Sequence, residues 1–348
     1  MTLRAELSGR KPVVDFHAYF QPPRFLAHLR GRKQYPRIER VDGREAVFTG
    51  PGAARPIRPE QIDLDRRIEL MDDAGVDVQI LRLQNVGGID SFPVDEAVEM
   101  ARMVNEELAQ VAARYRGRFV PFAAVPLQSA EQATSEALHA VSALGHRGVG
   151  VSCHHEGIGL DDARYGQFLR TLEELDVPLL VLPNHPPLLE EKLHPYGWLA
   201  GSFGFQVDLA WSVLRLLASG VAERVVPHLT LIVANLGGVV TSLTERLDQY
   251  WERVHTGSTT LETRPSEAIR RFYFETASAH PATIATAASI LGSDRLLFGS
   301  DYPSFSLKRG VQNIVESKLS SRDVQSILSG NASRVLARER AGEQTPTA

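Results

Sequence analysis

The chain has one cysteine, no long apolar run and no large excess of charge of either sign. Because Cys153 is the single cysteine, an internal disulfide framework is excluded and a reducing, cytoplasmic compartment is expected. A formal net charge of -4 offers no basic surplus to a nucleic acid or an anionic membrane, so neither is expected as a partner. Residues 1–11 lack the apolar segment of a signal peptide, and no run is long enough to cross a bilayer.

Short apolar runs bounded by turn residues recur along the whole chain of 348 residues. They are Val13–Phe20, Val78–Gln84, Phe119–Pro126, Gly148–Cys153, Pro178–Pro183, Thr230–Asn235, Phe272–Ala277 and Leu296–Asp301. Continuous apolar runs are typical of parallel strands buried on both faces, and stretches with helical period separate them. Eight such repeats predict a (β/α)₈ TIM barrel. The competing doubly wound sheet lacks support, because no Gly-x-Gly-x-x-Gly follows the first run.

Two segments interrupt this repeat. His28–Pro59 is rich in Arg, Gly and Pro and predicts an insertion after the first strand. Pro186–Gly204 follows the fifth strand. Both should border the C-terminal mouth of the barrel, where active sites form. We therefore expect one barrel domain over residues 1–337, followed by a polar, disordered tail over 338–348.

The predicted strand ends carry polar side chains and a set of motifs. The motifs are Val14–Phe20, Met71–Asp77, Arg118–Pro126, Leu296–Pro303 and Gly330–Leu336. On these motifs the chain resembles the metal-dependent amidohydrolase family, in the branch that contains aminocarboxymuconate-semialdehyde decarboxylase and γ-resorcylate decarboxylase. The resemblance runs from the first strand to the last helix. It implies a small carboxylated substrate and a homodimer.

The resemblance also implies a metal site that this sequence has largely lost. Members usually begin with His-x-His, and both histidines bind a divalent metal; here these positions are His17 and Tyr19. A ligating His before Pro is replaced by Leu182, and a catalytic His before a Gly pair by Asn235, whereas Asp301 is retained. A catalytic zinc site generally takes three protein ligands and a water. We therefore predict that the protein uses no metal and no other cofactor.

The leading hypothesis is a metal-independent enzyme that acts on a small cyclic or aromatic carboxylated compound by hydrolysis or decarboxylase-like C–C cleavage. His17 is the expected general acid/base with Asp301 as its partner, and Tyr19 and Asn235 are expected to donate hydrogen bonds to an oxyanion. His17 and Asp301 could instead only hold the first and last strands together. Two further histidines follow strand ends and are candidates for substrate binding: His154 and His185.

Two alternatives remain open at this point. Loss of three of the family's key side chains is also what a catalytically inactive homologue would show, serving as a metabolite-binding or partner subunit. The other alternative is a zinc-dependent decarboxylase or hydrolase with a relocated ligand, such as His154 or His185.

Overall fold

The computed structural model describes residues 11–50, 54–84, 87–184, 193–254 and 261–337. Its centre is a ring of parallel strands, and most of their side chains are buried. The eight strands of the ring are β1 (Val14–Phe20), β5 (Val78–Leu83), β6 (Phe119–Pro121), β7 (Val149–Ser152), β10 (Leu179–Leu182), β11 (Leu231–Val233), β12 (Tyr273–Glu275) and β13 (Leu296–Leu297). Each lies within a predicted apolar run.

Two seams close the ring. The first joins the first and last strands: the amide of Phe16 donates to the carbonyl of Phe298 at 2.8 Å, and that of Tyr19 to Tyr302 at 3.1 Å. The second joins β6 to β7, where the amide of Ala123 donates to the carbonyl of Gly148 at 2.8 Å. The predicted barrel is thereby confirmed, including hydrogen bonding between its first and last strands.

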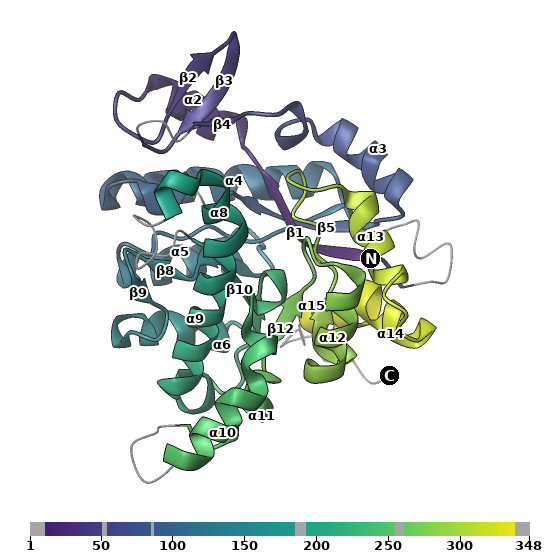
Figure 1. Ribbon diagram of the computed structural model, residues 1–348. Helices are drawn as coiled ribbons and strands as arrows, with labels where there is room; N and C mark the ends of the chain where they lie inside the picture. The colour runs from purple at the N-terminus through teal and green to yellow at the C-terminus, as the bar shows by residue number, and fades with distance from the viewer. Residues whose placement is uncertain (1–10, 51–53, 85–86, 185–192, 255–260, 338–348) are drawn as a thin grey trace, which may run out of the picture.

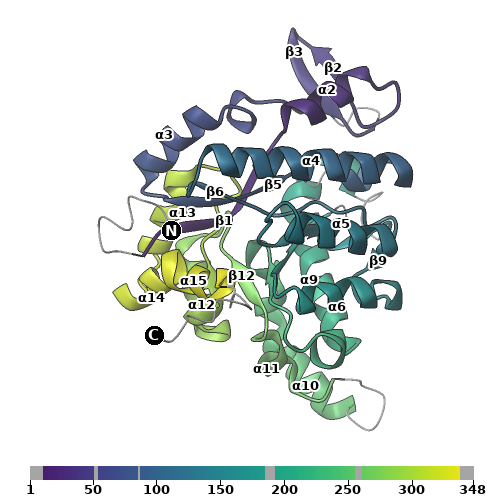
Figure 2. The ribbon, with the colours of Figure 1, turned by 180° about the vertical axis from the view of Figure 1, so that it is seen from behind.

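Helices connect the strands and surround the ring (Figure 1; Figure 2). They are α3 (Leu64–Ala74), α4 (Val94–Arg114), α5 (Ala130–Ser142), α6 (Gly166–Glu174), α8 (Gly197–Leu199), α9 (Phe205–Ala218), α10 (Thr244–Val254), α11 (Pro265–Ile269), α12 (Pro281–Leu291), α13 (Leu307–Val315), α14 (Ser321–Gln325) and α15 (Asn331–Leu336). Local sequence sets their ends. In α3, for example, the Asp63 side chain accepts from the amide of Arg66, and Gly75 ends the helix with a φ of 73°. No described helix is both long and apolar enough to span a membrane.

The insertion after β1 forms a small subdomain of its own. Helix α2 (Pro23–Gly31) leads into an antiparallel sheet of β2 (Arg37–Val41), β3 (Arg44–Phe48) and β4 (Ala54–Pro56). This sheet stands beyond one end of β1, apart from the ring (Figure 1). Because Arg55 of β4 lines the same cavity as His17 and Asp301, the insertion borders the site as expected. A two-residue hairpin, β8 (His154–His155) with β9 (Ile158–Gly159), follows β7.

Candidate active site

His17 is the centre of a polar group at the C-terminal end of the ring. Its Nδ1 lies 2.8 Å from Oε1 of Glu275, at the end of β12. On the other side of the imidazole, Nε2 lies 2.8 Å from Nη2 of Arg82 and 3.4 Å from Oδ1 of Asp301. Nε2 thus faces both a donor and an acceptor. A neutral imidazole can accept from Arg82 there, and a protonated one can donate to Asp301.

Backbone amides hold Glu275 rigidly beneath His17. Oε1 accepts from the amide of Asn235 at 2.6 Å, and Oε2 accepts from the amide of Ala277 at 2.7 Å. The chain leaves room for this carboxylate at Gly299, since a Cβ there would lie 1.8 Å from Oε2. With its other contacts fixed, Glu275 orients the imidazole and keeps the Nδ1 proton on the side away from the cavity.

A second buried carboxylate, Asp15 of β1, joins this strand to β5 and to the loop after β13. It accepts hydrogen bonds from the amide of His17, from Nε2 of Gln79, and from both the amide and the hydroxyl of Ser300. Burial raises the pKa of Asp15 to about 6, while these hydrogen bonds act in the opposite direction. Asp15 therefore has a positioning role: it holds β1, β5 and the loop after β13 in register around His17.

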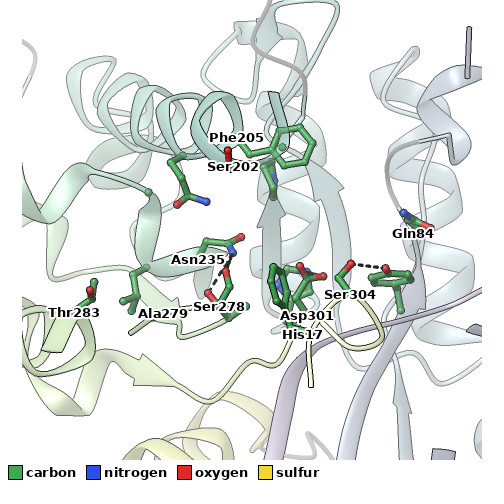
Figure 3. Close-up of a pocket in the computed structure, with 18 of the residues that line it drawn as sticks. His17, Gln84, Ser202, Phe205, Asn235, Ser278, Ala279, Thr283, Asp301 and Ser304 are labelled. Carbon is green, nitrogen blue, oxygen red and sulfur yellow. Dashed lines mark hydrogen bonds and ion pairs between the residues drawn. The ribbon is translucent and has the colours of Figure 1, made fainter. Parts of the chain in front are cut away.

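A cavity of about 550 Å³ opens above this group. Figure 3 shows His17 and Asp301 together on one side of it, Asn235 and Ser278 beside them, and Ser202 and Phe205 opposite. The volume is in the range of sites for small organic ligands. The cavity therefore suits a single-ring molecule, with the imidazole exposed to it on the Nε2 side.

Tyr19 and Asn235, both predicted as oxyanion donors, do line the cavity. The Tyr19 hydroxyl lies 2.7 Å from the hydroxyl of Ser304, so one of the two can present a proton to a ligand. The Asn235 amide nitrogen donates to the carbonyl of Ala277 at 3.3 Å and to the hydroxyl of Ser278 at 3.2 Å. In this arrangement the Asn235 amide is engaged with the protein, so its carbonyl oxygen is the group left for a ligand.

The charges around His17 oppose one another. Burial lowers the pKa of His17, and the positive charge of Arg82 lowers it further. The negative charges of Glu275 and Asp301 outweigh both effects, so the pKa lies above its ordinary value. For Asp301 the directions are reversed: burial raises the pKa of this carboxyl, while His17 and Arg82 lower it. An imidazole whose pKa is moved upwards from about 6.5 is a competent proton donor near neutral pH.

Three charged residues of this site have no assigned role in the prediction from sequence: Arg82, Glu275 and Arg55. Arg82 lies inside a strand that reads as continuously apolar apart from this residue and Gln79, and its charge was the available signal. Glu275 is the last residue of a buried strand, which is a position where function is expected in a barrel. Arg55 could not be placed, because it lies in the insertion.

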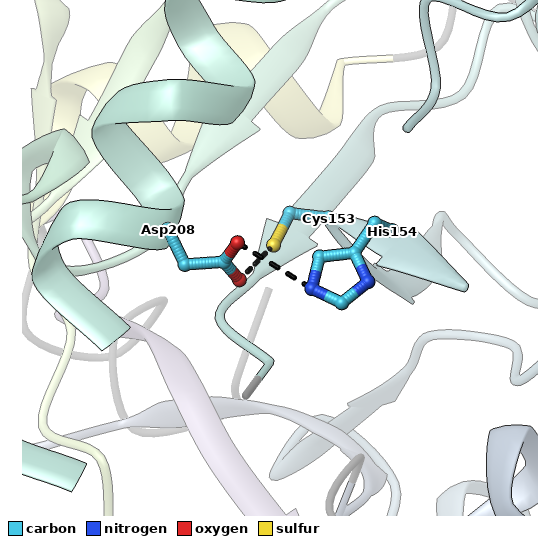
Figure 4. A group of neighbouring side chains, drawn as sticks. All are labelled: Cys153, His154 and Asp208. Carbon is cyan, nitrogen blue, oxygen red and sulfur yellow. Dashed lines mark hydrogen bonds and ion pairs between the residues drawn. The ribbon is translucent and has the colours of Figure 1, made fainter. Parts of the chain in front are cut away.

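The structure does not bring His154 to the cavity. Its Nε2 instead lies 3.4 Å from Oδ1 of Asp208 on α9, and the Cys153 thiol donates to Oδ2 of Asp208 at 2.7 Å (Figure 4). The reason is local: strand β7 ends at Ser152, and the His154 ring turns towards α9. The other predicted histidine, His185, lies outside the described residues.

Cys153, His154 and Asp208 offer donor atoms within 4.8 Å of one another, the one such group found in the described chain. Their types suit zinc, but the tautomer does not. The amide of Gly157 donates to Nδ1 of His154 at 3.1 Å, so the neutral ring carries its proton on Nε2, the atom that would have to ligate. Burial raises the pKa of the Cys153 thiol well above its ordinary value. The group is therefore best described as a hydrogen-bonded anchor between β7 and α9.

The profile of the amidohydrolase family matches residues 14–338. The chain belongs to the amidohydrolase family. It is 32% identical over 257 residues to γ-resorcylate decarboxylase of Rhizobium radiobacter, covering 69% of this chain and 76% of that protein. It is 25% identical over 279 residues to the 2-amino-3-carboxymuconate-6-semialdehyde decarboxylase of Dictyostelium discoideum, covering 79% and 76%. These relatives confirm the branch to which the motifs pointed.

A solved structure gives the same placement. The dihydroxybenzoic acid decarboxylase of Polaromonas sp. JS666, with bound manganese and the inhibitor 2-nitroresorcinol, superposes with a TM-score of 0.80 at 26% identity, covering 94% of this chain and 97% of that one. The relative's manganese raises the question of whether this amidohydrolase has residues that could hold such an ion.

The residues around His17 do not fit a divalent metal. Among the described His, Cys, Asp and Glu side chains, no group of three at the cavity brings its donor atoms together. Leu182 is aliphatic, and the Tyr19 hydroxyl is hydrogen-bonded to Ser304. The Nε2 atom of His17, the nitrogen that faces the cavity, is already in contact with the cationic guanidinium of Arg82. The described residues at this cavity therefore provide no site for a catalytic divalent ion.

Proposed function

We propose that this amidohydrolase is a metal-independent decarboxylase of a small aromatic carboxylate, with His17 as the proton donor. The observation that carries the proposal is the pair of partners at Nε2 of His17, Arg82 at 2.8 Å and Asp301 at 3.4 Å. This geometry supports both protonation states of the imidazole on the face that lines the cavity. The decarboxylases among the relatives supply the reaction class.

Substrate binding is assigned to the cation that the insertion contributes. Arg55 lines the cavity, and burial lowers the pKa of its guanidinium while the nearby Tyr19 and Asp301 raise it. A guanidinium group can bind a carboxylate through two parallel hydrogen bonds. In this proposal Arg55 holds the carboxylate of the substrate, and the aromatic ring of the substrate lies over His17.

The proton then moves from Nε2 of His17 to the ring carbon that bears the carboxylate. The bond between that carbon and the carboxylate breaks, its electron pair restores the aromatic ring, and carbon dioxide leaves. His17 is left neutral, its Nε2 accepts from Arg82, and it regains a proton from water. Asp301 stabilises the protonated imidazole before the transfer, and Glu275 holds the Nδ1 proton throughout.

The first test is carbon dioxide release from γ-resorcylate and a panel of related hydroxybenzoic acids. We expect His17→Asn and Asp301→Asn each to lower the rate by about 10²- to 10⁴-fold, as for removal of a positioned acid/base. The double variant should be little worse than either single one, because the pair acts as a unit. His228→Asn, on the exposed surface, serves as the control and should retain the full rate.

Three outcomes decide the proposal. Turnover that depends on His17 and Asp301 supports it. Full activity in both variants moves the chemistry elsewhere and overturns the assignment. Binding of these acids without carbon dioxide release would instead identify a catalytically inactive binding protein.

A further inference from the structure

Arg82 is a buried cation at the floor of the cavity. It lies in β5, opposite Tyr19 of β1 in the strand register, and its exposed fraction is 3%. Nη1 donates to the carbonyl of Leu83 at 2.9 Å, and Nη2 lies 2.8 Å from Nε2 of His17. Two contacts therefore fix the plane of the guanidinium against the imidazole.

The barrel interior is shaped around the stem of this side chain. A Cβ at Gly150 of β7 would lie 3.3 Å from Cδ of Arg82 and 3.7 Å from Cδ1 of Leu182. The glycine therefore leaves room for Arg82, and Leu182 of β10 borders the same space. An aliphatic side chain at this point packs beside the methylene groups of an arginine, whereas a ligating histidine would face its positive charge.

The guanidinium is not neutralised by a bidentate ion pair among the described residues. Its Nε is buried and has no hydrogen-bond partner there. Burial lowers the pKa of Arg82 to about 10, with Asp301, Tyr19 and Glu275 acting in the opposite direction, so the group stays charged at neutral pH. The floor of the cavity thus carries a fixed positive charge beside His17 and Asp301.

We propose that the Arg82 guanidinium takes the electrostatic place that a divalent ion has in the manganese-bound relative, and that it binds an anionic oxygen of the substrate. This inference rests on the proposed function and deepens it. Two cations, Arg55 from the insertion and Arg82 from the floor, select an acid with a second oxygen substituent next to its carboxylate, such as a hydroxybenzoate. The guanidinium and a metal exclude each other, because both would occupy the lone pair of His17 Nε2.

A guanidinium in place of a divalent ion also limits the reactions that the site can catalyse. A metal can lower the pKa of a bound water and deliver hydroxide, whereas a guanidinium can only stabilise an anion and donate hydrogen bonds. An arginine in this position suits proton transfer to carbon with loss of carbon dioxide. It does not suit the metal-hydroxide hydrolysis that other members of a metal-dependent family could perform.

Measurement of the metal content tests whether the Arg82 guanidinium excludes a metal ion from His17. Wild type, Leu182→His, and the double variant Arg82→Met/Leu182→His are produced in medium with added Mn²⁺ and Zn²⁺, and metal per chain is measured. Wild type and L182H should hold far less than stoichiometric metal, whereas the double variant should gain close to one ion per chain. Stoichiometric metal in wild type, or in L182H as much as in the double variant, would overturn the inference.

The affinity for an unreactive probe tests the role of the Arg82 charge independently of catalysis. The affinity for 2-nitroresorcinol, measured by calorimetry with a chelator present, should fall by about 10- to 100-fold in Arg82→Met, as for loss of one charge-assisted hydrogen bond. Arg82→Lys keeps the charge and should lose less. Arg40→Met removes an exposed arginine of the insertion that does not line the cavity, and it should leave the affinity unchanged.

The two proposals fail separately in these experiments. If Arg82→Met binds the probe as tightly as wild type, the role of Arg82 is wrong whatever the enzyme catalyses. Should R82M not fold, equal affinity in Arg82→Gln and Arg82→Lys would contradict the role of charge. If metal content and binding follow the expectation but no acid loses carbon dioxide, only the proposed reaction is wrong.

Discussion

His17 owes its properties to the partners on its two nitrogens. Glu275 holds Nδ1, and Nε2 lies between the donor Arg82 and the acceptor Asp301. When this imidazole changes its protonation state, it exchanges the hydrogen bond from Arg82 for one to Asp301, so Nε2 has a partner in either state. The acid/base function that we propose for His17 therefore depends on its neighbours and not on the histidine alone.

A pH dependence follows from these neighbours. Burial opposes protonation of His17, but Glu275 and Asp301 raise its pKa above the ordinary value of about 6.5. If protonated His17 is the proton donor, the rate is full below this raised pKa and falls as the pH rises through it. Asp301→Asn removes one of the anions, so the pKa of His17 should fall and the alkaline limb of kcat should move to lower pH. An unchanged limb in the residual activity of this variant would show that another group titrates.

The antiparallel sheet of the insertion is the element that completes the cavity. It contributes a cation through Arg55 of β4, whereas Arg40 of β2 is exposed and does not line the cavity. In the function that we propose, the insertion sets which acids are accepted and the barrel performs the chemistry. Such a division suits a barrel with a fixed scaffold and variable loops.

Arg55→Ala should therefore weaken substrate binding more than catalysis. We expect KM for the carboxylate substrate to rise by about tenfold or more, as for loss of a charge-assisted hydrogen bond, with a smaller change in kcat. Arg40→Ala, in the same small sheet, is the matched control and should keep the wild-type KM. Equal effects of the two substitutions on KM would point to a disturbed sheet and remove Arg55 from substrate binding.

At the scale of the whole molecule, the barrel could be predicted because each of its strands is a separate apolar run. The alternation of runs with helical stretches specified the order of elements, and closure followed from their number. His17, Tyr19, Asn235 and Asp301 could be predicted as one group because strand ends converge at the mouth of a barrel.

The rest of the site depends on side-chain directions that spacing does not reveal. His154 follows a strand end as His17 does, but its ring turns towards Asp208 on α9. Arg82 lies in the middle of an apolar strand, and only the space at Gly150 shows where its stem runs. Arg55 reaches the cavity from an insertion whose fold is not encoded in the barrel repeat.

The central claim is that this member of the amidohydrolase family decarboxylates its substrate without a metal. The most direct measurement is the rate of carbon dioxide release from the best hydroxybenzoate, before and after exhaustive dialysis against a chelator, with metal analysis of the same samples. The account predicts an unchanged rate at negligible metal content, and no stimulation by added Mn²⁺ or Zn²⁺. A rate that disappears on chelation and returns in proportion to the manganese taken up would contradict it.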